Sequence, residues 1–149
     1  MATALRPQHA VVACLASVAV SLILVGLVSA TLIRHLIQIL PVVAALGAVA
    51  RQPRWGAYAA MAVCLFWLAI MTLIWLYLLG IARIVGGHFS AAEIVLTLVI
   101  GVSSIWGIVA AARVRPAAGL AARAVALLAF AALQIGAMWV SLLQPFANR

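Results

Sequence analysis

Residues 10–33 read AVVACLASVAVSLILVGLVSATLI, a run of 24 residues without a charged side chain. An α-helix rises about 1.5 Å per residue, so about 20 apolar residues cross the hydrocarbon core of a bilayer, which is about 30 Å thick. Neither this run nor the later apolar runs alternate polar and apolar residues as a transmembrane β-strand does. The run therefore predicts a membrane-spanning helix and an all-α integral membrane protein.

Three further charge-free runs follow, at residues 55–82, 94–112 and 124–148. Short segments that contain glycine or proline separate these runs, and both residues are common where helices end. We expect four transmembrane helices in a compact bundle that forms a single transmembrane helical domain over residues 1–149. The expected spans cover about residues 9–33, 56–82, 91–113 and 118–143.

The segment that follows the first run decides the number of crossings. A return crossing would have only the 15 residues Leu36 to Ala50, fewer than a bilayer requires. Its turn, near Ser29 to His35, would contain no glycine, proline or asparagine, which are the usual turn residues. We therefore expect a short kinked or interfacial helix near residues 41–52, and we keep five crossings as the alternative.

The N-terminus has one further interpretation. Val28-Ser29-Ala30 resembles the cleavage site of a secretory signal peptide. The apolar run is longer than the roughly 7–15 residues of such a signal, so we expect this segment to remain as a helix.

The composition agrees with insertion in a membrane. Hydrophobic residues make up 70% of the chain and charged residues 7%, whereas about a quarter of an ordinary globular chain is charged. The chain has nine arginines, one glutamate and a formal net charge of +8. Because the arginines are scattered between apolar runs, we expect them to orient the chain in a membrane rather than to bind nucleic acid.

The arginines also predict an orientation. With four or with five crossings, one side of the membrane holds Arg51, Arg54, Arg113, Arg115 and Arg123. Positively charged loops stay in the cytoplasm, so the C-terminus is expected outside, with Arg83 and Arg149. The composition resembles that of small bacterial membrane proteins that use arginine alone as a basic residue. We therefore expect a multi-pass protein of the bacterial inner membrane.

Glu93 is the only carboxylate side chain of the chain. An acidic residue in a membrane span is a functional candidate because burying its charge is costly. On a helix, Glu93, Thr97 and Ser104 fall on one face, and this polar stripe could line a path for a substrate or a proton. The other members of this candidate binding set are Arg83, His88 and Gln134. Gln134 and Ser141 could meet Thr97 in the outer half of the bundle, where a structural hydrogen bond between helices is the simpler explanation.

The same glutamate has a structural interpretation, which we favour. Ser90 and Glu93 have the spacing of a capping box, in which both side chains bond free amide groups at the start of a helix. Arg83 could then act as an ion partner of the carboxylate. A cap or an ion pair would explain Glu93 without any transport chemistry.

A second candidate site lies in the aromatic-rich run at residues 55–82. Trp67, Met71 and Trp75 recur at helical spacing and form one bulky face. A quinone or a lipid tail could lie against this face through stacking and Met-aromatic contacts. Packing against a neighbouring helix is the simpler explanation, so no cofactor is predicted beyond a bound lipid or quinone.

The last span is rich in small residues, with ten alanines among residues 117–137. Small side chains let helices approach closely inside a membrane. One face of this span holds Ala122, Ala126, Ala129 and Gly136. We expect it to pack either on the small face of residues 103–111 or on another subunit.

Several chemistries lack the residues that they require. The sequence has no glycine-rich phosphate loop, no second carboxylate, and no serine or cysteine beside an evident base. No histidines or cysteines have metal-ligand spacing. We therefore expect no catalytic residues and no metal site.

The resulting hypothesis is a non-catalytic polytopic membrane protein that acts as a subunit or partner of a larger membrane assembly. One alternative is a homo-oligomeric small transporter or channel that uses Glu93 and its polar stripe. Another is a lipid- or quinone-binding membrane protein or enzyme. The expected partners are membrane lipids and other membrane subunits or further copies of the chain, and not nucleic acid.

Overall fold

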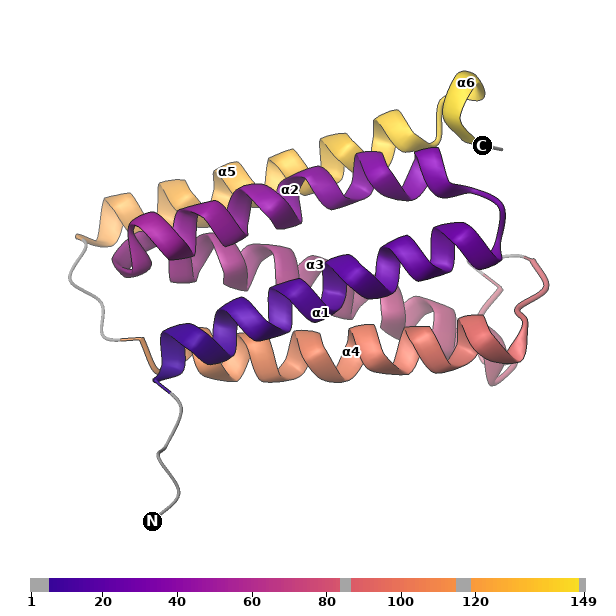
Figure 1. Ribbon diagram of the computed structural model, residues 1–149, viewed down its shortest axis with the longest axis horizontal. Helices are drawn as coiled ribbons and strands as arrows, with labels where there is room; N and C mark the ends of the chain where they lie inside the picture. Colours follow the sequence, from indigo (N-terminus) through magenta and orange to yellow (C-terminus); the bar gives the residue numbers. More distant parts are fainter. Residues whose placement is uncertain (1–5, 84–86, 115–118, 148–149) are drawn as a thin grey trace, which may run out of the picture.

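Six helices make up the computed structural model, which describes residues 6–83, 87–114 and 119–147 (Figure 1). They are α1 (Pro7–Val28), α2 (Leu32–Arg51), α3 (Pro53–Leu78), α4 (Ala91–Ala112), α5 (Leu120–Ser141) and α6 (Gln144–Ala147). The first five run back and forth along one direction and form a bundle, and the described residues contain no strand (Figure 1). The expected all-helical fold is confirmed.

Five of these helices, α1 to α5, are long and apolar enough to cross a membrane, one more than the four that we expected. Residues 32–51 form one helix of 20 residues, so the expected short helix near residues 41–52 is wrong. Pro41 lies inside α2, where neighbouring helices can satisfy the backbone groups that a proline frees. The structure therefore agrees with the alternative of five candidate spans.

The turn between α1 and α2 has no glycine, yet it reverses the chain within three residues. Ala30 takes the left-handed conformation with a φ of 55°, which glycine normally supplies at the end of a helix. The Thr31 amide donates to the Gly26 carbonyl at 2.9 Å, and the Ser29 hydroxyl donates to the Val25 carbonyl at 2.7 Å. Hydrogen bonds therefore close a turn that residue types alone did not indicate.

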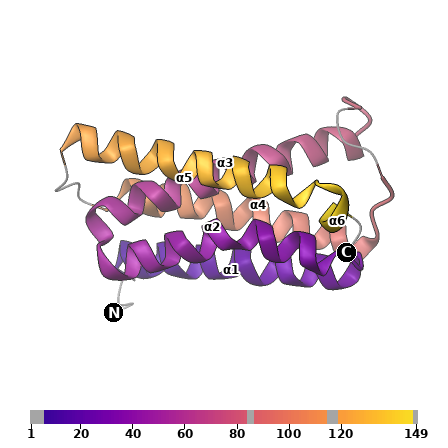
Figure 2. The ribbon, with the colours of Figure 1, turned by 90° about the horizontal axis from the view of Figure 1, so that it is seen from above.

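Helix α3 lies at the centre of the bundle and contacts α1, α2, α4 and α5. Helix α1 packs mainly against α2 and α4, while α5 lies at one edge and packs on α3 and α2 (Figure 2). The largest fully buried apolar side chains include Val11, Leu15, Val18, Leu22, Val42 and Val63. The core thus sits mainly among α1, α2 and α3.

Two glycines permit close helix contacts. A Cβ added to Gly56 of α3 would lie 2.6 Å from backbone atoms of Ala48 in α2. A Cβ added to Gly107 of α4 would lie 2.7 Å from the Cys64 Sγ of α3 and 3.3 Å from the Cys14 Cβ of α1. These contacts hold α3 against α2 at one end and bring α1, α3 and α4 together in the interior.

Because successive helices run in opposite directions, most of the described arginines lie at one end of the bundle. Among the described residues, this arginine-rich end holds Arg6, Arg51, Arg54, Arg113 and Arg123. It lies at the left of Figure 1, and the opposite end holds Arg34 and Arg83. Four crossings would have placed Arg34 beside Arg51, but the continuous helix α2 separates the two arginines along its length.

Candidate functional site

Glu93 lies in the first turn of α4 and forms the predicted capping box with Ser90. The Glu93 Oε2 accepts hydrogen bonds from the Ser90 amide and the Ser90 hydroxyl, each at 2.7 Å. The Glu93 amide donates to the Ser90 Oγ at 3.3 Å. A carboxylate at a helix N-terminus also interacts favourably with the helix dipole, so the surroundings of Glu93 stabilise it as a cap.

Arg83 and His88 lie in the connection between α3 and α4, and both side chains are exposed. Within the described residues, no ion pair or hydrogen bond joins either of them to Glu93, and no group of three His, Cys, Asp or Glu side chains could hold a metal ion. Nearby, the Tyr77 hydroxyl donates to the Gly87 carbonyl at 2.9 Å. The three candidate residues Arg83, His88 and Glu93 therefore share one end of the bundle without forming a cluster.

The rest of the polar stripe on α4 points into the bundle. Thr97 is 4% exposed and Ser104 is fully buried. The Thr97 hydroxyl donates to the Ile94 carbonyl at 2.7 Å, whereas the Ser104 hydroxyl has no partner among the described residues. The adjacent Ser103 contacts Ser17 of α1, with 2.9 Å between the hydroxyl oxygens. The sequence did not reveal this last contact, since Ser17 is one hydroxyl in a long apolar run.

Gln134 belongs to a different site, which we call the α2–α5 polar cluster: Gln38, Gln134 and Ser141. The Gln38 Nε2 donates to the Ser141 Oγ at 2.9 Å, and the Gln134 Nε2 donates to the Gln38 carbonyl at 3.2 Å. All three side chains are buried, and the Gln134 Oε1 has no partner in the described part of the chain. The cluster joins α2 to α5 about one turn before Pro41.

The α2–α5 polar cluster overturns the expected contact of Gln134 and Ser141 with Thr97. Helix α5 makes no contact with α4 in the described regions, because α3 packs against both of them. For the same reason the small faces of α4 and α5 do not pack on each other. Sequence position identified the polar residues, but the order of helices around the bundle determines which of them meet.

The aromatic face of α3 contributes to a groove, which we call the α3–α4 groove. Met71 and Trp75 of α3 line it together with Thr97 and Gly101 of α4, and its volume is about 300 Å³. No charged side chain lines it, so this surface is suited to holding an apolar group rather than to proton transfer. Gly101 helps to keep the space open, since a Cβ there would come no nearer than 3.8 Å to Met71.

Trp67 does not share this groove. It is 2% exposed and packs in the core, with its ring edge-to-face against Phe66 at a centroid distance of 5.7 Å. Its indole N–H has no hydrogen-bond partner among the described residues. The predicted ligand face is therefore divided, since Met71 and Trp75 reach the groove and Trp67 fills the interior.

Comparison of the chain with protein-family models, curated proteins and solved structures finds no match. Its function must therefore be inferred from its own residues. The observations that bear on function are the cap at Glu93, the α2–α5 polar cluster, the α3–α4 groove and the uncovered side of α5.

Proposed function

We propose that the chain is a non-catalytic polytopic membrane protein that acts as a subunit or partner of a larger membrane assembly. The observation that carries this proposal is the poor burial of α5. Over an apolar stretch of 18 residues in α5, 17% of the residues are buried, against 33–39% over the corresponding stretches of α1 to α4. Helix α5 is thus the helix whose sides are least covered by its own chain.

Small residues form one stripe on the uncovered surface of α5, which also carries large exposed side chains such as Leu128 and Trp139. Ala122, Ala129 and Gly136 are exposed and recur every seven residues, which places them on one side of the helix. A Cβ added to Gly136 would meet no described atom within 4 Å. Helices associate in lipid through close van der Waals fit, and small side chains allow that fit. This small face therefore supports contact with a helix of another subunit or of a second copy.

The proposed location is the bacterial inner membrane, with five crossings. Five described arginines lie at the arginine-rich end and two at the opposite end. The positive-inside rule then favours a cytoplasmic arginine-rich end. The N-terminus would lie inside and the C-terminus outside.

Cysteine cross-linking in native membranes tests the proposed interface. We expect Ala129→Cys and Gly136→Cys to cross-link to a partner chain, and Val102→Cys, on the lipid-exposed side of α4, to remain uncross-linked. The native Cys14 and Cys64 are buried, so the unsubstituted chain is the blank. Two differently tagged copies distinguish self-association from another subunit. A monomer in mild detergent, with no cross-link at either α5 position, would contradict the proposal.

The α3–α4 groove favours a second candidate function, the binding of a quinone or a lipid tail. A flat ring can stack on Trp75, and the Met71 thioether adds contacts of the kind that sulfur makes with aromatic rings. We expect Gly101→Leu to fill the groove and abolish retention of added quinone in native mass spectrometry. Gly136→Leu, a matched change outside the groove, should leave retention intact. Equal retention by both variants would argue against this function.

A further inference from the structure

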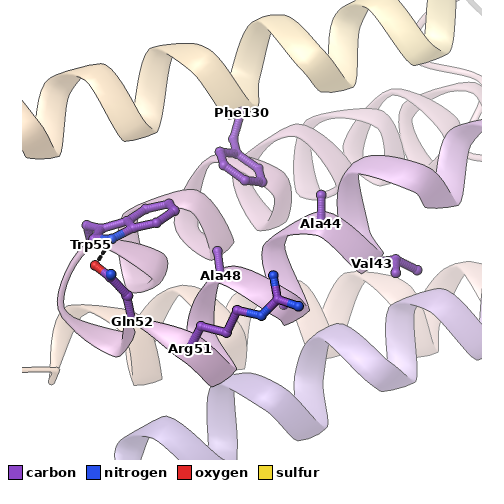
Figure 3. Close-up of a pocket in the computed structure, with 8 residues that line it drawn as sticks. Val43, Ala44, Ala48, Arg51, Gln52, Trp55 and Phe130 are labelled. Atoms are coloured by element: carbon purple, nitrogen blue, oxygen red, sulfur yellow. Dashed lines mark hydrogen bonds between the residues drawn. The ribbon is translucent and has the colours of Figure 1, made fainter.

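A second groove opens at the arginine-rich end of the bundle, between α2 and α5. Its volume is about 520 Å³, within the range of about 300–1,000 Å³ that is usual for small-molecule sites. The residues that line it include Ala44, Gly47, Ala48, Arg51, Trp55 and Phe130. Figure 3 shows Phe130 reaching from α5 toward the α2 side of this space.

Within the described residues, the side-chain hydrogen bonds that join α2 to α5 lie toward the opposite end of the bundle, away from this groove. The α2–α5 polar cluster makes those bonds. Toward the arginine-rich end, α2 presents Ala44, Gly47 and Ala48, which are too small to fill the space. A Cβ added to Gly47 would meet no described atom within 4 Å, so the floor of the groove is open at this position.

The mouth of the groove is polar and positively charged. Arg51 is exposed at the last residue of α2, and among the described residues its guanidinium has no hydrogen-bond or ion-pair partner. The Trp55 indole N–H donates to the Gln52 Oε1 at 2.6 Å (Figure 3). This bond leaves the Gln52 amide nitrogen as a second donor beside Arg51. Tryptophan side chains are enriched at membrane interfaces, and Trp55 lies near the arginine-rich end.

We propose that this groove, which we call the Arg51 groove, binds an acidic phospholipid. One acyl chain lies along Ala44, Gly47 and Phe130, and the phosphate accepts hydrogen bonds from the Arg51 guanidinium and the Gln52 amide. Arginine binds phosphate oxygens in a bidentate geometry, and basic pockets between membrane helices favour anionic headgroups. A net negative headgroup matches the unneutralised arginine, whereas a zwitterionic headgroup brings its own cation and a quinone brings no charge.

Native mass spectrometry of the full chain, released from micelles that contain equal amounts of phosphatidylglycerol and phosphatidylcholine, tests this site. We expect the chain to retain phosphatidylglycerol in preference. Arg51→Gln should lower that preference about fivefold, the contribution of one basic residue near an anionic surface. Gly47→Trp should remove retention of both lipids at this site, because the indole fills the groove. The matched control is Arg83→Gln, an exposed arginine at the opposite end, which should change nothing.

Several results would overturn the proposal. They are equal retention of the two lipids by the unsubstituted chain, an equal loss with Arg83→Gln, and undiminished retention by Gly47→Trp. Displacement of the lipid by inorganic phosphate would show that Arg51 binds free phosphate instead. A lower dimer fraction in Arg51→Gln and Gly47→Trp would show that a second copy occupies the groove. Ala44→Leu fills the same groove with a smaller side chain, and it replaces Gly47→Trp if the latter does not elute as a folded species.

The test is independent of the association proposed for α5. A chain that is monomeric in detergent can still retain phosphatidylglycerol, and a chain that cross-links through Gly136→Cys can still lack any preference for an acidic lipid. Failure of one proposal therefore leaves the other standing.

Discussion

At the scale of single residues, backbone geometry rather than charge restricts which residue types several positions can hold. Ala30 takes a conformation that glycine prefers, while Gly56 and Gly107 stand where a side chain does not fit. Glu93, the residue of greatest chemical interest in the sequence, is held by a helix cap. Single substitutions at these positions separate structural roles from functional ones.

Replacing Ala30 by glycine should stabilise the protein. A residue with a Cβ costs roughly 1–2 kcal/mol in the left-handed region, and glycine is free of that cost. We expect Ala30→Gly to raise the free energy of unfolding by about 1 kcal/mol, less the entropy that glycine adds to the unfolded chain, as measured by denaturant titration in detergent. Ala69→Gly, an exposed change inside α3, should instead destabilise. A loss of stability in Ala30→Gly would count against the left-handed turn.

Replacing Gly56 by alanine should destabilise the contact between α2 and α3. The added methyl would lie 2.6 Å from the Ala48 backbone, and such overpacking typically costs about 1–3 kcal/mol. The matched control is Gly47→Ala, whose methyl enters open space and whose helix propensity improves. Thermal unfolding in detergent compares the two variants. Equal midpoints would mean that the two helices are not in close contact at Gly56.

At the scale of elements, polar contacts decide how helices pair. Gln38 and Gln134 link α2 to α5, and Ser17 and Ser103 link α1 to α4. In a bundle whose helix surfaces are almost entirely apolar, such bonds specify which helices are neighbours, at a typical contribution of about 0.6–2 kcal/mol each. The Arg51 groove lies between the same two helices, on the other side of Pro41 from the bonds that Gln38 makes.

The cap of α4 gives a prediction that distinguishes structure from transport. Ser90→Ala removes the hydroxyl that accepts from the Glu93 amide, and loss of such a cap typically costs about 1 kcal/mol. Glu93→Gln keeps a side chain that a capping box accepts, so its stability should change less. If Glu93→Gln abolished a proton or solute flux in proteoliposomes while stability stayed the same, the cap would not be the whole role of Glu93.

At the scale of the whole molecule, five helices give the bundle two different ends and leave one helix at its edge. The arginine-rich end and the opposite end differ in charge, and the proposed orientation rests on that difference. The poorly covered helix α5 is available for association, and the Arg51 groove lies beside it. Both proposed interactions therefore concern the same edge of the bundle.

Labelling of introduced cysteines tests five crossings directly. Ala30→Cys and Gln52→Cys lie at opposite ends of α2, so five crossings place them on opposite sides of the membrane. With a membrane-impermeant maleimide on intact bacterial cells, we expect Ala30→Cys to be labelled and Gln52→Cys to be protected until the cells are opened. Four crossings with an interfacial helix would place both cysteines in the cytoplasm and protect both.

The sequence by itself determined the helical class, the glycine- and proline-containing segments that separate the later helices, and the cap of α4. These features depend on local properties, namely the length of charge-free runs, the positions of glycine and proline, and the spacing of Ser90 and Glu93. The sequence did not predict the turn between α1 and α2. Alanine does not indicate a left-handed residue, and the hydrogen bonds that close the turn around Ala30 are seen only in the structure.

Only the tertiary structure decided which polar and small residues meet. Gln134 lies on α5 and Thr97 on α4, and α3 packs against both helices and keeps them apart. Hydropathy cannot specify that order, because nearly every face of these helices is apolar, and an apolar face does not by itself select its neighbour. The order of the helices depends on close contacts at Gly56 and Gly107 and on the hydrogen bonds of Gln38. These contacts join residues that are far apart in the sequence, so only the packed helices reveal them.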